Sequence, residues 1–446
     1  MRYRVGENKG QVIVGFAAAA VFLLAMIGLA IDIGMAYLVK TKLSAAVDAA
    51  ALAAVKMASQ GESVVGKEAA KFFSINYPDG MLGAAVAAPA TVLFYDNKEK
   101  SYTVTVSTTA VVPAYFAKVV GRNEFTVGAK ATTTVTPVDL VLVLDTSATM
   151  RNPNVGVLEA LKVAARKFLD NFNPNFDRIG LIRFASGVSE DFKITGKRGF
   201  DKEKMQQLLS STDVVASGFT TAEEALRRAK DQLDSIPEHD RSRRRIIVFF
   251  ADGAPNGIAA RYESEKGPTD GVVSSQTRPT PNHPTWDYHH LYKIDKVNSD
   301  LLSPDLASSL VTLPETDWTG TVPLKSFNGI RRLLAVADGD DVGQICNVNR
   351  AARNMAENVA NAARSEASPI SVFAIWRGAK LDKPEIEVCG YGSSENGQNI
   401  MRRLANVPGV DTYNPNQPKG IYVSAEPEEF EAAFRHVAES VIRLSR

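Results

Sequence analysis

The sequence predicts an α/β fold, with a doubly wound, mostly parallel, Rossmann-like sheet preceded by a single N-terminal transmembrane helix and a small α+β domain. Three observations predict it. Residues 138–144 form a mostly apolar strand, and a strand without polar alternation must be covered on both faces, as in a parallel sheet. From Val138 onward, strand-like apolar runs alternate with helical patterns, which is typical of a doubly wound domain. Near the N-terminus, residues 12–31 contain no charged side chain.

The charge-free run 12–31 is just long enough to cross a bilayer as one helix, and its apolar pattern continues to Val39. We therefore expect a stub at 1–11 and a transmembrane helix at 12–39. A cleaved signal peptide is the competing interpretation, but its apolar region is usually shorter. Prepilin-type processing after Gly10 is disfavoured, because Gly15 stands where a prepilin carries an acidic residue. Basic residues flank the run on both sides, so the charge rule does not decide its orientation.

Asp32 lies at the far edge of this run, where a carboxylate can reach the membrane interface. A polar residue at a helix end is favoured over a proton relay. The helix is expected to continue with a stripe of mostly small side chains, spaced three or four residues apart: Leu43, Val47, Ala51, Val55 and Ala58. Such a face packs closely either on another helix or on its own domain, and both interpretations stay open.

The small α+β domain is expected at residues 40–137. Three segments rich in β-forming residues predict strands, and residues 111–121 between the last two are expected to form a short helical connection. The predicted strands are Thr91–Tyr95, Tyr102–Val112 and Phe125–Val135.

In the C-terminal domain, residues 138–446, three further strands are predicted at Arg178–Ala185, Arg245–Ala251 and Ile370–Ile375. Helices are predicted near 155–171, 221–235, 349–366 and 427–444. Residues 255–343 break the alternation and are expected to form an insertion that overlies the adjacent sheet edge. In this insertion, residues 287–290 (Asp-Tyr-His-His) lack a fourth metal ligand, and residues 338–341 (Asp-Gly-Asp-Asp) lack the full calcium-loop pattern.

Oxygen-bearing side chains follow two of the predicted strands. Asp145, Ser147 and Thr149 stand at alternate positions after the first strand, and Asp252 ends another before a turn-permitting glycine. Strand ends of this kind form ligand sites in open α/β sheets, and hard oxygen donors favour a cation like Mg²⁺. Residues 217–221 add a hydroxyl on a tight loop at a helix start. The alternative interpretation is that these are ordinary turn and N-cap residues.

The set Asp145-x-Ser147-x-Thr149, Thr220 and Asp252-Gly253 resembles the metal-ion-dependent adhesion site (MIDAS) of von Willebrand factor type A domains. That family has Ser at the fifth position of the first motif, where this chain has Thr149. The resemblance implies that Ser147, Thr149 and Thr220 bind Mg²⁺, or Mn²⁺ or Ca²⁺, directly or through water. It implies that Asp145 and Asp252 hold the ion largely through waters, with one position left for a carboxylate of a partner protein. Thr220 is favoured as the third-loop ligand, and Thr221 is the fallback.

The N-terminal segments 10–14, 28–34 and 43–54 resemble those of the TadG-like proteins of tight-adherence (Flp) pilus assembly. This resemblance implies a bacterial inner-membrane, single-pass protein with a cytoplasmic stub at 1–11, a pilin-like small domain and an extracytoplasmic (periplasmic) C-terminal domain. Cys346 and Cys389 are the only cysteines, and a disulfide between them would tie the exit of the insertion to the sheet edge. An extracytoplasmic setting favours such a bridge.

A net charge of +1 gives no basic footprint, so nucleic acid is not the expected partner. The sequence contains no Gly-rich phosphate loop, nucleophile elbow or HExxH motif, and we expect no enzyme. The expected function is metal-dependent protein binding by a membrane-anchored component of Flp pilus assembly or anchoring. The alternatives are a surface adhesin that binds host or matrix ligands (cell adhesion), and an accessory subunit of an ATP-driven complex. The apolar anchor argues against the last one, because such subunits normally work in the cytoplasm.

Overall fold

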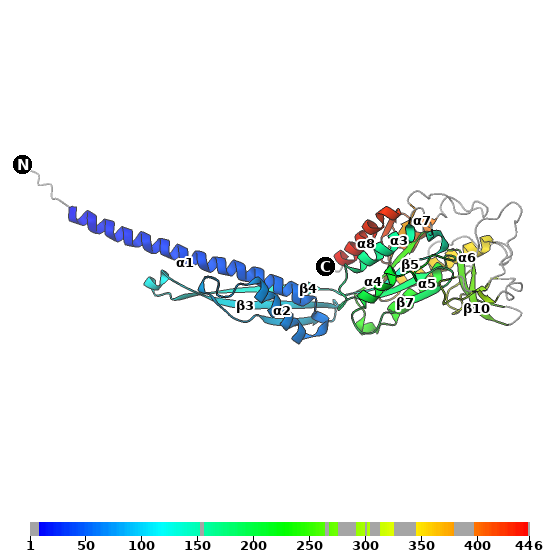
Figure 1. Cartoon of the computed structure of the whole chain (residues 1–446), viewed down its shortest axis with the longest axis horizontal. Coiled ribbons are helices and arrows are strands. Elements are labelled where there is room, and N and C mark those ends of the chain that lie inside the picture. Colours follow the sequence, from blue (N-terminus) through cyan, green and yellow to red (C-terminus); the bar gives the residue numbers. More distant parts are fainter. Residues whose placement is uncertain are drawn as a thin grey trace, which may run out of the picture. The chain divides into compact units, whose positions relative to one another are not determined.

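The computed structural model describes residues 9–151, 156–263, 267–274, 291–298, 301–303, 313–324, 345–378 and 397–444. The chain divides into two compact units, residues 1–135 (unit 1) and 136–446 (unit 2) (Figure 1). Residues 287–290, residues 338–341 and Cys389 lie outside the described residues, as does the side chain of Cys346. The predictions made for them, including the disulfide, therefore stay predictions.

Unit 1 is an antiparallel sheet covered on one face by helices. Its long strand β3 pairs with β1, β2 and β4. The alternating Thr and Val residues of β3 explain this arrangement, because Val104 and Val106 are buried while Thr103 and Thr105 face threonines of β4 on the other side. The three predicted strands are confirmed. The elements are α1 (Lys9–Val55), η1 (Ala58–Gln60), α2 (Glu62–Asn76), η2 (Met81–Gly83), β1 (Ala85–Val86), β2 (Ala90–Asp96), β3 (Ser101–Pro113), η3 (Ala117–Val120) and β4 (Glu124–Val135).

Helix α1 is continuous over 47 residues, so the predicted extension beyond residue 39 is confirmed. The stripe from Leu43 to Ala58 is buried against β3, β4 and α2. Packing on its own unit is thus the correct interpretation of this stripe, and the cover includes helix α2 of the same unit as well as the two strands. Residues 13–33, in contrast, expose most of their large apolar side chains. Among the described helices, α1 is long and apolar enough to cross a membrane, which makes it a candidate anchor.

Asp32 does not lie at a helix end, because α1 runs on to Val55. The prediction of a helix-end residue is therefore wrong. Its carboxylate is 1 % exposed and accepts hydrogen bonds from the backbone N–H groups of Tyr115, Phe116 and Ala117 at 3.1, 2.8 and 2.7 Å. These groups open the turn between β3 and β4, where only Ala117–Val120 are helical, as a 3₁₀ turn. The carboxylate therefore caps the connection that was expected between the two strands.

Unit 2 contains a six-stranded sheet in the order β14-β13-β8-β5-β6-β7. All neighbouring strands are parallel except the edge strand β7, which is antiparallel to β6. The doubly wound, mostly parallel sheet is confirmed. Its strands are β5 (Val138–Asp145), β6 (Arg178–Phe184), β7 (Val188–Phe192), β8 (Arg244–Ala251), β13 (Ile370–Arg377) and β14 (Tyr422–Ala425).

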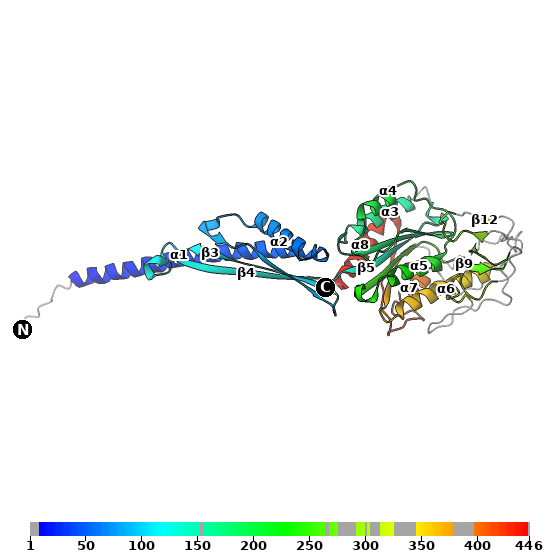
Figure 2. The same ribbon diagram turned by 90° about the horizontal axis from the view of Figure 1, so that it is seen from below.

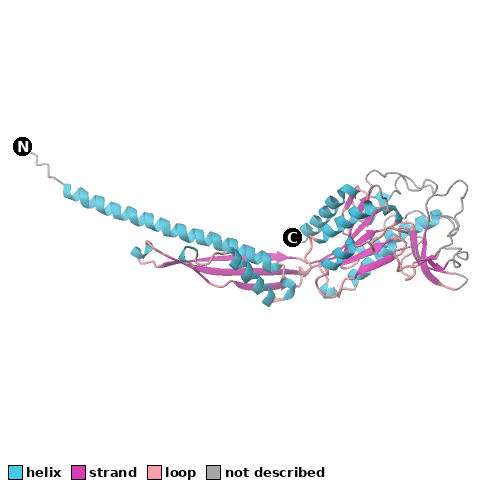
Figure 3. Cartoon of the chain, viewed as in Figure 1, coloured by secondary structure: helices cyan, strands magenta, loops and turns pink. Residues whose placement is uncertain are grey.

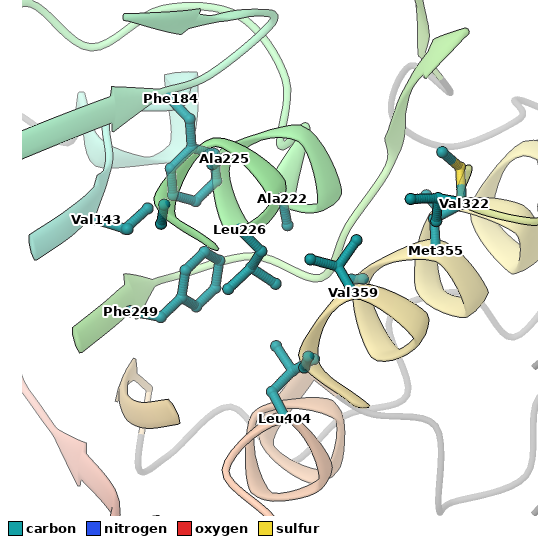
Figure 4. Packing of buried hydrophobic residues seen from close by; sticks show 14 of the residues in the cluster. Val143, Phe184, Ala222, Ala225, Leu226, Phe249, Val322, Met355, Val359 and Leu404 are labelled. Atoms are coloured by element: carbon teal, nitrogen blue, oxygen red, sulfur yellow. The ribbon is translucent and has the colours of Figure 1, made fainter. Parts of the chain in front are cut away.

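Helices cover both faces of this sheet (Figures 2 and 3). Strand β5 is buried throughout and sends Val141 and Val143 into one core and Leu142 and Leu144 into the other. The first core packs on α5, α6 and α7, where Phe184 and Phe249 meet Leu226 (Figure 4). The second core packs on α3, α4 and α8. The helices are α3 (Val157–Leu169), α4 (Lys202–Ser210), α5 (Ala222–Asp234), α6 (Ile345–Arg364), α7 (Gly397–Leu404) and α8 (Phe430–Leu444), with short 3₁₀ turns η4 (Ala148–Met150), η5 (Glu238–Asp240) and η9 (Pro427–Glu429).

The described part of the insertion forms a second sheet, which the sequence did not predict. Its antiparallel strands have the order β12-β11-β10-β9. Strand β9 packs on α5 and α6, and Ala259 N–H donates to the buried carboxylate of Glu223 on α5 at 2.8 Å. The insertion is thus anchored on the main domain. Its strands are β9 (Gly257–Tyr262), β10 (Thr269–Ser274), β11 (Leu291–Tyr292) and β12 (Leu301–Ser303).

Candidate metal centre

The candidate site begins where the central strand β5 ends. Asp145 is the last residue of this strand and is fully buried, since β8 and β6 pair with β5 on either side. Its Oδ1 accepts the Ser147 N–H at 2.7 Å, and its Oδ2 lies 3.5 Å from the Asp252 N–H donor. Asp145 therefore holds two loops in place, the one that follows β5 and the one that follows β8.

The side chains of these two loops meet. The Ser147 and Thr149 hydroxyls lie 3.0 Å apart. The Thr149 hydroxyl donates to Asp252 Oδ1 at 2.6 Å, and the Ser147 hydroxyl lies 3.5 Å from the same oxygen. Four of the five predicted ligands thus form one cluster at the carboxyl edge of the sheet, where open α/β sheets bind ligands.

The third loop, residues 216–221, is fastened to the first by backbone hydrogen bonds. Ala148 N–H donates to the Gly218 carbonyl at 3.1 Å, and Ser217 N–H donates to the Thr146 carbonyl at 2.9 Å. Gly218 has φ +81° and lies so close to Ser186 that a Cβ would fall 2.2 Å from its hydroxyl oxygen. Only glycine fits this left-handed, crowded position, which allows the loop to reach the edge of the site.

Thr220 and Thr221 have different surroundings in this loop. The Thr220 hydroxyl oxygen lies beside the Asp252 loop, 3.4 Å from where a Cβ on Gly253 would be. The Thr221 hydroxyl donates to the Ser186 carbonyl at 2.8 Å and is fully buried. This geometry favours Thr220 as the third-loop ligand, because the Thr221 hydroxyl is already engaged with the backbone.

The two carboxylates are close enough to affect each other. Burial raises the pKa of Asp145 well above its usual value, and the negative charge of Asp252 raises it further. Burial also raises the pKa of Asp252, although hydrogen bonds from Thr149 and Arg377 act to lower it. Two buried carboxylates that repel each other are best compensated by a cation between them.

Sequence reasoning missed Arg377, which supplies a positive charge at this point. Its guanidinium donates to Asp252 Oδ2 at 2.8 Å. Arg377 is the last residue of β13, and the parallel register pairs Trp376 with Ala251, so Arg377 stands level with Asp252. The predicted strand ended at Ile375, two residues short. Extending it to the carboxyl edge of the sheet would have revealed this neighbour.

Asn256, at the start of the insertion, was also missed. Its side-chain oxygen accepts the Thr220 N–H at 2.7 Å, and its own N–H donates to the Thr220 carbonyl at 3.1 Å. Farther along the insertion, Asn298 lies 3.4 Å from the hydroxyl of Ser217. The insertion therefore flanks the third loop and fixes its backbone.

The donor set suits a small hard cation, because it combines two carboxylates with three hydroxyls that converge from three loops. Within the described residues, no group of three or more His, Cys, Asp or Glu side chains gathers as a metal cluster. A site of the predicted kind has only two such side chains and relies on hydroxyls for the rest, so this finding does not conflict with it. A divalent cation between Asp145 and Asp252 would favour the charged form of both carboxylates, against the effect of their burial.

Two family models match the chain. Residues 140–254, from β5 through all three loops, match the model described as von Willebrand factor type A domain. The chain thus carries a domain of this class, as its sheet and its loop arrangement also indicate. Residues 10–59 match the model described as Flp pilus-assembly TadE/G-like. The chain therefore combines a TadE/G-like N-terminal segment with a von Willebrand factor type A domain, and the resemblance to TadG-like proteins is confirmed.

No curated protein matches the sequence significantly. Among solved structures, the chain is similar to the pilus adhesin SpaC of Lactobacillus rhamnosus GG, with 17 % identity over 80 % of this chain and 35 % of that one, at a TM-score of 0.41. This chain thus spans about a third of the adhesin's length. It is also similar to the vWF domain of the type V pili tip protein Mfa5 of Porphyromonas gingivalis (15 % identity, 70 % and 97 % coverage, TM-score 0.40). Another similar structure is that of the PilB minor pilin of Streptococcus sanguinis (12 % identity, 81 % and 79 % coverage, TM-score 0.39). Because these scores are low, the assignment rests on the two family models.

Proposed function

We propose that this chain is a membrane-anchored, extracytoplasmic binding protein that assembles or anchors a tight-adherence (Flp) pilus through a metal-dependent contact with another protein. The observation that carries the proposal is the convergence of three loops at one sheet edge, in a chain whose N-terminal segment is TadE/G-like. The proposed ligands are Asp145, Ser147, Thr149, Thr220 and Asp252.

The chemistry of these residues suits binding better than catalysis. A bound Mg²⁺ or Mn²⁺ would supply an electrophilic centre, because few charged ligands would neutralise it. Ser147, Thr149 and Thr220 would hold it by their hydroxyls, while Asp145 and Asp252 would orient water around it and fix the loops. A carboxylate from a partner protein is the natural occupant of a remaining coordination position.

The proposed topology places α1 across the inner membrane with unit 2 in the periplasm. The exposed apolar surface of residues 13–33 supports the crossing, and the TadE/G-like match supports the pilus context.

Metal binding is tested on the detergent-solubilised full chain by calorimetric titration and thermal unfolding. At a free metal concentration of about 100 Kd, binding stabilises the folded state by about 2.7 kcal/mol. For a unit of this size, this raises Tm by on the order of 5 °C. Asp145→Ala should abolish both the binding heat and the shift. The matched control is Asp213→Ala, because Asp213 is an exposed carboxylate outside the site. A parent protein with neither heat nor shift would refute the metal site.

The partner is tested by a photo-crosslinking amino acid in place of Ala148, which is exposed beside Ser147. We expect crosslinks in cell membranes to a pilus or envelope protein, and we expect EDTA or Asp252→Ala to remove them. If the protein is instead found at the outer surface and crosslinks only to host or matrix proteins, the adhesin function is correct and the assembly function is wrong.

A further inference from the structure

The turn between β3 and β4 carries apolar side chains that the rest of unit 1 leaves exposed. We refer to residues 114–121 as the hairpin tip. The exposed fraction is 87 % for Val119 and 69 % for Val120, and Tyr115 and Phe116 are also more than half exposed. Soluble proteins rarely gather large apolar side chains on a surface without a partner or a membrane to cover them.

The hairpin tip lies alongside the N-terminal half of α1 (Figures 1 and 2). Phe116 rests on Gly28, where an added Cβ would fall 2.6 Å from the Phe116 Cβ. A cleft of ≈ 450 Å³ lies between the tip and the helix and is lined by apolar residues of α1 from Val21 to Leu29. The tip thus extends along the same stretch of α1 that is proposed to cross the membrane.

The backbone N–H groups at the start of the tip have hydrogen-bond acceptors within the protein, as a medium without water requires. In hydrocarbon, each unpaired N–H group costs several kcal/mol, so a non-helical turn is tolerated only when its polar groups are paired. Asp32 accepts the N–H groups of Tyr115, Phe116 and Ala117. Farther along the turn, Val119 N–H donates to Phe116 O and Gly121 N–H donates to Lys118 O. The N–H groups that begin the turn therefore find acceptors inside the protein.

The rise per residue of α1 gives the depth of the tip in the bilayer, measured from Asp32. Asp32 directly follows the charge-free run 12–31, which matches the roughly 30 Å hydrocarbon core of a bilayer. At about 1.5 Å per residue, Gly28 lies roughly 6 Å and Val21 roughly 16 Å from Asp32 toward the membrane centre. A tip that contacts this part of α1 must lie in the same layer.

We propose that the hairpin tip enters the lipid bilayer beside α1, so that Phe116, Val119 and Val120 contact acyl chains. The proposal rests on the proposed membrane anchoring of α1. Lipid is the occupant that the structure favours, because the exposed surface of the tip continues the exposed apolar surface of residues 13–33. The two cations of the turn, Lys118 and Arg122, are exposed and have stems long enough to reach anionic headgroups. Lys118 also lies close enough to Asp32 to interact with its charge.

The test is depth-sensitive fluorescence quenching of the full chain in phosphatidylcholine–phosphatidylglycerol vesicles, with or without phosphatidylcholine brominated at the middle of its chains. One tryptophan is introduced by Val120→Trp, and the signal of the unchanged protein, with its three native tryptophans, is subtracted. The matched control is Val92→Trp, because Val92 is 59 % exposed in the same unit. It lies opposite Thr105, roughly 27 Å along β3 from the tip. A third variant, Leu23→Trp, reports on α1 itself.

We expect brominated lipid to quench the V120W and L23W variants several-fold more than the V92W variant. If L23W is quenched and V120W is not, the anchoring stands and the tip proposal is wrong. If neither is quenched, the anchoring itself is wrong. A V120W emission that is blue-shifted but unquenched would mean that protein and not lipid covers the tip, and it would also overturn the proposal. Phe116→Trp, which keeps an aromatic ring, provides the same readout if V120W does not reconstitute.

Discussion

Arg377 occupies the Asp252 carboxylate that the proposed divalent cation would need, and we predict that its removal strengthens metal binding. The guanidinium donates to Asp252 Oδ2 at 2.8 Å, and the carboxylate is buried. Its Nε is buried and has no hydrogen-bond partner within the described residues, so the arginine is only partly held in this position. A metal ion at the site would experience the repulsion of this charge, or Arg377 would have to leave.

The magnitude follows from the single hydrogen bond between the guanidinium and the carboxylate. A hydrogen bond to a charged group contributes about 1.5–3 kcal/mol, and about 1.4 kcal/mol corresponds to a factor of ten in affinity. Arg377→Gln keeps much of the side-chain volume and removes the charge. We therefore expect Kd for Mg²⁺ to fall about 10- to 100-fold, while the metal-free protein becomes less stable because Asp252 loses its partner.

The assay is calorimetric titration of Mg²⁺ into the full chain, with Arg151→Gln as the control. Arg151 belongs to the same group of loops, but it donates to the Ala216 carbonyl and not to a carboxylate. An unchanged or weaker affinity in the R377Q variant would refute the competition and would indicate that Arg377 positions Asp252 for the metal. An absence of binding in both the parent and the variant would refute the metal site instead.

Two further predictions concern the stability of unit 2, measured by urea unfolding of the full chain with the fluorescence of its native tryptophans. Burial raises the pKa of Asp177 to about 6 from 3.8. The protonated form therefore stabilises the fold at low pH, and about 3 kcal/mol of this stability is lost as pH rises from about 4 through 6. Asp177→Asn should remove that change in the free energy of unfolding between about pH 4 and 6. An unchanged pH dependence of the free energy of unfolding would contradict the raised pKa of Asp177. Phe249→Ala should cost about 3–5 kcal/mol, because the ring is buried and stacks on Phe184 at 5.2 Å. A loss of unfolding free energy below about 1 kcal/mol would show that the core collapses into the cavity left by the Phe249 ring.

The sheet of unit 2 was predictable because its strands have a simple signal. A strand buried on both faces is a nearly continuous apolar run, and β5, β6, β8 and β13 all show one with at most a few polar residues. The edge strands gave no such signal. Strand β7 has the sequence Val-Ser-Glu-Asp-Phe and is mostly half-buried, and β14 has only four residues. Edge strands pair on one side only, so their sequences are less constrained.

The candidate site was predictable where its residues are close in sequence or end a recognisable strand. The Asp145 motif and Asp252 satisfied this condition. Arg377 and Asn256 did not, because their roles depend on register and on the path of the insertion. The stripe from Leu43 to Ala58 was ambiguous for another reason. A face of small residues packs equally well on a helix or on a sheet, and only the fold shows that β3 and β4 cover it.

Two buried carboxylates show how a structural role is distinguished from a functional one. Asp32 at the membrane segment and Asp252 at the sheet edge are both nearly inaccessible to water. The donors to Asp32 are three backbone N–H groups, which cannot leave without unfolding the turn. The donors to Asp252 are the side chains of Thr149 and Arg377, which can rotate away. A charge inside a candidate membrane segment first suggests function, yet the exchangeable partners at Asp252 support the sheet edge, and not Asp32, as the proposed place of ion binding.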